Sequence, residues 1–491
     1  MPRSLPVVAN STNHLVVLID KAVQQHGPNC NLNYIDVSNV DDFKGVFRKW
    51  PKFNGDISKW VIHGKNADAM FETVPQEPVV ATDPSHLQTL IRQTLHLNGD
   101  ASDLNHIDVS DITYFTDTFK AFPTFNGDIS KWSVGNADTM KCMFKGCAFN
   151  GDISNWDVSK VLTMEGMFLD SKFDGDLSRW DVSRVRNMQD MFGKSQFNQN
   201  ISRWNTSDVR SMAGMFSESK FNQPIGDWDV RQVQLFGMMF ALSSFNHPLS
   251  KWKTSSARNT MMMFVGAAFD DDISGWDLRS VVNMQHMFAQ SQFNGDISSW
   301  NVSNVRTMEH MFDGSQFNGC LANWDVSKVG YFACMFQNSP FSGDVSRWNT
   351  KSALEMNAMF AQTPNFNSPL SGWDVSQVIS IEEMFKESAF AQDISHWKLP
   401  SNASTIDLHK NNPRFIQAQK TMTPFILGVL TQTDELPSDP GWAKAMEQVR
   451  PVARGLGLAR HDHVQAVMDT HARIAHASND PVLALPGGLV Q

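Results

Sequence analysis

Cysteine is scarce in this sequence, which excludes two kinds of stabilising site. The 491 residues contain five cysteines, Cys30, Cys142, Cys147, Cys320 and Cys334, and no Cys-x-x-Cys motif. An odd number of thiols at irregular spacing is typical of unpaired cysteines. Neither a disulfide framework nor a zinc site made from thiolates is therefore predicted.

Long apolar runs are absent as well. No run approaches the roughly 18 residues that a membrane-spanning helix needs, so no membrane span is predicted. The apolar patch at Leu5–Ala9 is shorter than the apolar region of a signal peptide, so export by the classical signal-peptide route is not expected. The net charge of −10, from 41 basic and 51 acidic residues, argues against a nucleic-acid binder or an anionic-membrane binder.

Motifs for catalysis and for metal binding are also missing. The sequence has no glycine-rich phosphate loop, Gly-x-Ser-x-Gly motif or Cys/His dyad. On a helix, His461 and His463 would point about 200° apart, so they cannot share one metal ion. Asp152 and its equivalents in recurrent Asn-Gly-Asp turns are assigned to turn formation, because their column is interrupted and calcium needs about six to eight oxygens. We therefore expect a non-enzymatic protein without a cofactor or a metal site.

What the sequence does contain is a repeat with a fixed period. A tryptophan recurs at constant spacing, from Trp132, Trp156 and Trp180 through to Trp348, and after one inserted residue the series ends at Trp373 and Trp397. A period of this length is typical of a solenoid, in which each repeat forms one coil and buries its apolar side against its neighbours. We expect the indoles to form a continuous buried column.

One repeat, residues 153–173, predicts the structure of a coil. Trp156 and Val158 alternate with polar residues, which predicts a short strand with both side chains inward. The Met-x-x-Met-Phe sequence at 164–168 places three apolar side chains on one face of a helical turn. The predicted fold class is α/β: a right-handed leucine-rich-repeat-like solenoid with a short parallel strand and a short helical turn in each coil of the repeat, plus a small helical C-terminal tail.

These repeat units resemble those of a known family. Residues 149–168 and 293–312 closely match the string F-N-G-D-I-S-x-W-D-V-S-x-V-x-x-M-x-x-M-F. This string is similar to the repeats of BspA-like leucine-rich-repeat proteins of bacterial surfaces, and the resemblance covers about residues 14–400. It implies a non-enzymatic bacterial surface protein used in adhesion, host contact and virulence. Because no classical signal peptide is predicted, we expect secretion or surface display by a non-classical route, with a cytoplasmic location as the alternative.

The pattern also divides the chain into four parts. We predict a disordered leader at 1–13, an N-terminal helix plus two coils at 14–84, the main repeat solenoid at 85–400, and a helical C-terminal cap or small module at 401–491. The segment from His14 to Trp60 recurs further along the chain, from His86 to Trp132. Since this offset equals three periods of the repeat, we expect one continuous stack rather than two lobes.

The residues on either side of each tryptophan are the candidate binding residues. On a strand they face outward, and here they are rich in Asp, Asn and Arg. One hypothesis is a partner-binding concave face, because solenoids recognise partners through such extended surfaces. The alternative is a solvated face whose Asp and Asn side chains bond neighbouring turns. The candidates are Asp157, Arg179, Asp181, Arg203, Asp229, Asp277, Asp325 and Arg347.

These observations favour a monomeric repeat scaffold that binds a protein or another macromolecular surface ligand through the sheet face. The alternative is a secreted effector whose C-terminal tail carries the activity while the repeats target it. A third hypothesis is a structural protein that associates end to end.

Overall fold

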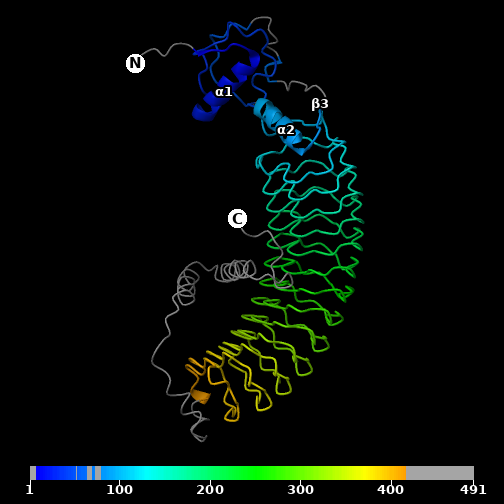
Figure 1. Ribbon diagram of the computed structural model, residues 1–491. Coiled ribbons are helices and arrows are strands. Elements are labelled where there is room, and N and C mark those ends of the chain that lie inside the picture. Colours follow the sequence, from blue (N-terminus) through cyan, green and yellow to red (C-terminus); the bar gives the residue numbers. More distant parts are fainter. Residues whose placement is uncertain (1–6, 51, 63–68, 72–78, 416–491) are drawn as a thin grey trace, which may run out of the picture.

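The computed structural model describes residues 7–50, 52–62, 69–71 and 79–415, which form a curved stack of coils preceded by a smaller N-terminal unit (Figure 1). Each of the two units begins with the same strand–helix–strand cassette, and within each cassette the two strands pair in parallel. The elements are β1 (Val7–Val8), α1 (Thr12–His26), β2 (Ile35–Asp36), β3 (Val79–Val80), α2 (Pro84–Asn98) and β4 (Ile107–Asp108).

Helix α2 covers the first coil of the main stack, and its ends follow from the sequence. The carboxylate of Asp83 accepts hydrogen bonds from the backbone N–H groups of Ser85 and His86, both at 2.9 Å, which caps the N-terminus. Gly99 ends the helix at a φ of 86°, a conformation that favours glycine. The apolar side is buried against the coils through Leu87, Ile91 and Leu95.

The boundaries of the predicted parts need two corrections. Val7 and Val8 form β1, with Val7 N–H donating to Tyr34 O at 3.1 Å, so the fold begins inside the segment predicted to be a disordered leader. At the other end the coils continue past residue 400: Ser404 bridges to Ser380, and Phe415 is buried in the main core. Both misassigned segments depart from the repeat string, which is why the pattern missed them. The helical tail and its histidines predicted after residue 415 lie outside the described residues.

The expectation of one continuous stack is wrong for the described residues, which have two main hydrophobic cores. Residues from Ala9 to Met70 form one core, and residues from Ala81 to Phe415 form another. Helix α2, rather than another coil, closes the start of the second core. The units meet where the guanidinium of Arg48 donates to Leu97 O near the end of α2, at 2.9 Å.

Parallel backbone bridges join each coil of the main stack to the next. They run in one column of residues spaced like the tryptophans, for example Thr139 to Thr163 and Thr163 to Asn187. Beyond this column alternate N–H groups also donate to the following coil, as Gly166 N does to Gln189 O at 2.7 Å. The backbone polar groups are thereby paired between coils, as buried backbone requires.

The hydrogen bonds of a coil differ from the predicted strand and helical turn. Around the tryptophan the chain makes two successive turns, in which Trp156 N donates to Ile153 O and Val161 N to Val158 O. In the described coils the Met-x-x-Met-Phe stretch is not helical, because its third residue has a positive φ, as in Cys142 at 53° and Gly166 at 59°. This left-handed conformation turns alternate N–H groups toward the neighbouring coil instead of back along a helix. The leucine-rich-repeat class and the right-handed sense stay predictions.

The tryptophans form the buried column that their period predicts. From Trp60 to Trp397 the indoles of the described coils are at most 7% exposed. Each indole N–H donates to a backbone carbonyl of the preceding coil, as in Trp252 Nε1 to Ile225 O at 3.1 Å. The bond recurs with nearly constant geometry because a buried indole N–H needs an acceptor.

Phenylalanine and asparagine of the Phe-Asn-Gly sequence form two further columns. The ring of Phe149 lies over Gly151, where an added Cβ would come within 2.8 Å of the ring, so a side chain at this position requires the ring to shift. The amide oxygen of Asn150 accepts a hydrogen bond from Asp174 N at 2.8 Å, and the same contact recurs from coil to coil. These residues therefore fix the register of one coil on the next.

We predict that Trp252→Ala lowers the free energy of unfolding by about 3 to 5 kcal/mol, because it leaves a cavity. The substitution also removes the indole stacked on Trp276 at 6.1 Å and one of the two hydrogen bonds that Ile225 O accepts, the other coming from Trp228 N. Urea unfolding measures the total, and hydrogen exchange should show the coils around Trp228 and Trp276 losing protection first.

The neighbouring substitution Lys251→Ala is the matched control. Lys251 forms an exposed ion pair with Asp227, so its loss should change the free energy of unfolding by less than about 1 kcal/mol. Equal effects of the two substitutions would contradict a structural role of the tryptophan column.

Candidate functional site

The Asp residues of the predicted binding column mainly stabilise the turns that contain them. The carboxylate of Asp157 accepts hydrogen bonds from the N–H and the hydroxyl of Ser159, at 3.0 and 2.6 Å. These bonds hold the pKa of Asp157 below its usual value. Asp229 instead pairs with Arg231 at 2.6 Å. The side chains of Arg179, Arg203 and Arg347 are exposed.

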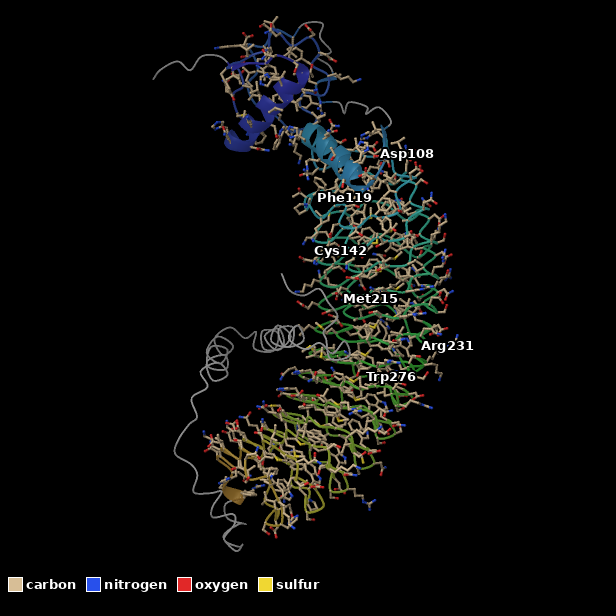
Figure 2. All side chains as sticks on the ribbon, in the orientation of Figure 1. Asp108, Phe119, Cys142, Met215, Arg231 and Trp276 are labelled. Atoms are coloured by element: carbon tan, nitrogen blue, oxygen red, sulfur yellow. The ribbon has the colours of Figure 1, made fainter. Side chains whose placement is uncertain are left out.

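This column lies on the outer side of the curved stack, not on the concave side as predicted. Figure 2 shows Arg231, which is two residues from Asp229, at the convex edge, and Cys142 near the concave edge. The prediction assumed the leucine-rich-repeat arrangement, in which the strand faces the concave side. Here the bridged column next to Cys142 holds the coils together instead.

Ring distances support the same direction of curvature. In one pair of successive coils, the ring centroids of Trp276 and Trp300 are 6.4 Å apart. In the same pair, the centroids of His286 and His310, on the side of the left-handed turns, are only 4.4 Å apart. A stack of repeats curves toward the side on which they are more closely spaced. The left-handed turns therefore line the concave surface, which we call the inner face.

Three columns of residues supply the side chains of the inner face. They occupy the positions of Lys141, Cys142 and Lys145 in one coil and recur in the later coils. Near both ends these columns carry ion pairs: Lys141 to Glu165 at 2.8 Å near one end, and Lys386 to Glu383 at 2.7 Å near the other.

The centre of the inner face is apolar. Six side chains from three successive coils form a hydrophobic cluster separate from the main core, which we call the methionine patch. Each of them is at most 3% exposed, and Leu242 packs against them. Thioether side chains adapt to partners of varied shape. The patch consists of Met238, Ala241, Met261, Met262, Val265 and Ala289.

Next to the methionine patch, stacking brings together a histidine, a carboxylate and a thiol. His310 Nδ1 lies 3.0 Å from a carboxylate oxygen of Asp313. Burial alone would lower the pKa of His310, but the adjacent Cys334 and Asp313 hold it well above its usual value. The sequence showed no Cys/His dyad because His310 and Cys334 are separated by one full period of the repeat. The period itself was the signal, since both residues occupy one column.

Asp190 is the buried carboxylate of the inner face. Only 6% of it is exposed, and Gln189 donates one hydrogen bond to it at 3.2 Å. Burial raises the pKa of Asp190 to about 7. Near neutral pH the structure thus holds a carboxylate that is more easily protonated than a free one.

Neither a metal cluster nor a membrane helix occurs in the part of the chain that the structure describes. No group of three or more His, Cys, Asp or Glu side chains there is arranged to hold a metal ion. None of the helices in that part is long and apolar enough to cross a bilayer. Asp152 instead accepts a hydrogen bond from Ser154 N at 2.9 Å, as expected of a turn residue.

A protein-family model described as "Mycoplasma protein of unknown function, DUF285" matches almost all of the coils. The matched segments are residues 20–77, 86–196, 170–269, 260–340 and 315–422. The chain belongs to this family. Tandem matches to one family model show a repeat protein, whereas the finer BspA-like assignment stays a prediction. Neither a curated protein nor a solved structure gave a match.

We predict that Asp190→Asn stabilises the protein more as the pH rises. In the folded protein Asp190 has a pKa of about 7, against 3.8 for the free side chain, so the folded state binds more protons between these values. The free energy of unfolding of the wild type therefore loses up to about 4 kcal/mol from this group as the pH rises through that window. Urea unfolding of both proteins at pH 4 to 8 measures the growing difference.

Asp157→Asn is the control of opposite sign. The pKa of Asp157 is lowered in the folded protein, so its stabilising contribution is present at neutral pH and is lost as the pH falls through the folded pKa. A constant difference between Asp190→Asn and the wild type from pH 4 to 8 would show that Asp190 is solvated.

Proposed function

We propose that this protein is a non-enzymatic repeat scaffold that binds a macromolecular partner through its inner face. The observations that support the proposal are the curved array itself (Figure 1) and, on its inner face, the methionine patch, a buried apolar cluster with ion pairs toward both ends of the array. Apolar centres surrounded by polar residues are typical of protein interfaces. The partner is accordingly a protein with an apolar segment that fits the concave side.

The repeats of the family support a scaffold, because curved repeat arrays use extended concave surfaces for recognition. A leucine-rich-repeat-like solenoid remains our proposed class. By resemblance to the BspA-like proteins we further propose adhesion or host contact, with delivery to the cell surface by a non-classical route. The effector hypothesis, with activity in the C-terminal tail, is the alternative.

The outer column is the competing binding surface. Arg179 and Arg203 are exposed in adjacent coils, and Asp229 lies in the coil after them. Its Asp residues already bond their own turns, which leaves the arginines as its main free charges for a partner. We therefore rank it below the inner face.

We predict that Met262→Asp weakens partner binding at least tenfold, because it places a charge in the buried apolar cluster that shapes the centre of the inner face. The backbone tolerates aspartate here, since Asp190 and Asp407 have the same left-handed conformation in the same column. The partner is first captured on immobilised protein and identified. Its dissociation constant is then measured in purified form against the variant and the wild type.

The matched control is the combined substitution of Arg179, Arg203 and Asp229 by alanine on the outer column. It should leave the dissociation constant within about twofold of the wild type and the melting temperature unchanged. The reverse result, with binding lost in the triple variant and kept in Met262→Asp, would move the site to the outer column.

A further inference from the structure

A carboxylate, an imidazole and a thiol from two successive coils lie in contact on the inner face. His310 Nδ1 lies 3.0 Å from a carboxylate oxygen of Asp313, and a side-chain hydrogen bond links His310 to Cys334 in the next coil. In the preceding coil, the ring of His286 stacks on the same imidazole at a centroid distance of 4.4 Å and an angle of 9°. The imidazole is therefore held between a carboxylate and a sulfur, which is the arrangement that activates cysteine nucleophiles.

The carboxylate of Asp313 depends on this imidazole. Only 5% of Asp313 is exposed, and its second oxygen, Oδ1, accepts no hydrogen bond from the described residues. A buried carboxylate with too few donors is costly unless a positive charge lies beside it. Burial lowers the pKa of His310, but Cys334 and Asp313 outweigh it and raise this pKa well above its usual value. A protonated imidazole beside a thiol favours the thiolate, which is the form that reacts.

We propose that Cys334 is a site of covalent modification, a thiol that forms a mixed disulfide with low-molecular-weight disulfides. The sulfur of Cys334 attacks one sulfur of the small disulfide, so that a new S–S bond forms and the old one breaks. The proton of the thiol passes to His310 and then to the sulfur that leaves. The Cys334 sulfur is oxidised and the leaving sulfur is reduced to a thiol, so no further oxidant is needed. This inference is independent of the proposed function, because it requires no macromolecular partner.

Cys142 is the matched comparison, because it occupies the same column of left-handed turns as Cys334, with φ of 53° against 55°. Cys142 is the more exposed of the two, since it is half-buried whereas Cys334 is 9% exposed. Its neighbours in the column are Asp117 and Gly166, and a Cβ added to Gly166 would come within 3.0 Å of its sulfur. Burial raises the pKa of Cys142, which slows its reaction. Exposure therefore predicts that Cys142 reacts faster, whereas pairing with His310 predicts that Cys334 does.

The rate of disulfide exchange at individual cysteines of the full chain tests the proposal. The reduced protein is mixed at neutral pH with dithiodipyridine, a small aromatic disulfide, and the reaction is stopped with acid at set times. Peptide mass spectrometry then gives the modified fraction of Cys142, Cys334 and the exposed Cys320 separately. The same reaction in urea gives the reference rates of the unfolded chain.

We expect Cys334 to react at least tenfold faster than Cys142 in the folded protein, because an ordinary thiol is only a few per cent ionised at neutral pH. In urea the two rates should be nearly equal. The substitution His310→Asn should lower the rate of Cys334 at least tenfold and leave that of Cys142 unchanged. Asparagine suits the left-handed backbone at this position, where φ is 54°, and it cannot take up a proton.

The substitution Asp313→Asn tests the positioning residue. It should also slow Cys334 at neutral pH, because the imidazole loses the carboxylate that favours its protonated form. At about pH 9.5 both this variant and His310→Asn should react as fast as the wild type, since an ordinary thiol has a pKa of about 8.5 and is then ionised without a histidine. A slow rate that persists at high pH would mean that the substitutions only block the sulfur, and it would contradict the pairing.

Two further results would overturn the proposal. Rates in the order of exposure, with Cys320 fastest and Cys334 slower than Cys142, would show that Cys334 is an inert buried thiol. This comparison is made in the wild type, so it does not depend on the folding of any variant. An unchanged rate of Cys334 in a folded His310→Asn variant, as judged by its melting temperature, would show that the histidine does not activate the thiol.

Discussion

The hydrogen bonds between successive coils impose the constraint on which the rest of this structure depends. From Thr139 to Ser404 one column of bridges joins each coil to the next, and alternate N–H groups beside it donate to the same neighbour. One residue is inserted before Trp373, and it raises the residue numbers of all later columns by one. The bridge across this insertion joins Glu355 to Ser380, so the pairing of the coils continues unchanged. The fixed period of the repeat thus reflects the pairing of backbone groups that have no other partners in the interior.

Side chains also join each coil to its neighbours, both in the interior and at the surface. In the interior, every described tryptophan from Trp60 onward donates its indole N–H to the previous coil, and the Phe149 column stacks at 5.8 to 6.4 Å. At the surface, the Asn150 column bonds the next backbone N–H. Each coil is therefore stabilised by its neighbours, and the ends need separate covers, which α2 supplies at the start of the main stack.

Curvature gives the two sides of the stack different roles. On the outer side, Asp and Asn side chains are bonded to their own turns. On the inner side, left-handed turns bring the coils close together, so residues one period apart in the sequence come into contact, as His286 and His310 do. This side accommodates the methionine patch, the buried Asp190 and the His310–Asp313 pair. The close spacing of the coils on this side brings buried polar and titratable side chains into contact.

The sequence by itself determined the period, the burial of the tryptophan, methionine and phenylalanine columns, the turns at Asn-Gly-Asp and the duplicated N-terminal cassette. These features depend on local spacing and on which side chains avoid water, and both can be read from the chain. Only the tertiary structure decided which side is concave and that Met164 and Phe168 lie in left-handed turns rather than a helix. It also decided that the cassettes have separate cores and that His310 meets Cys334. The physical reason is that hydrogen bonds to a neighbouring coil, which no local pattern encodes, select a backbone conformation that an isolated segment would not prefer.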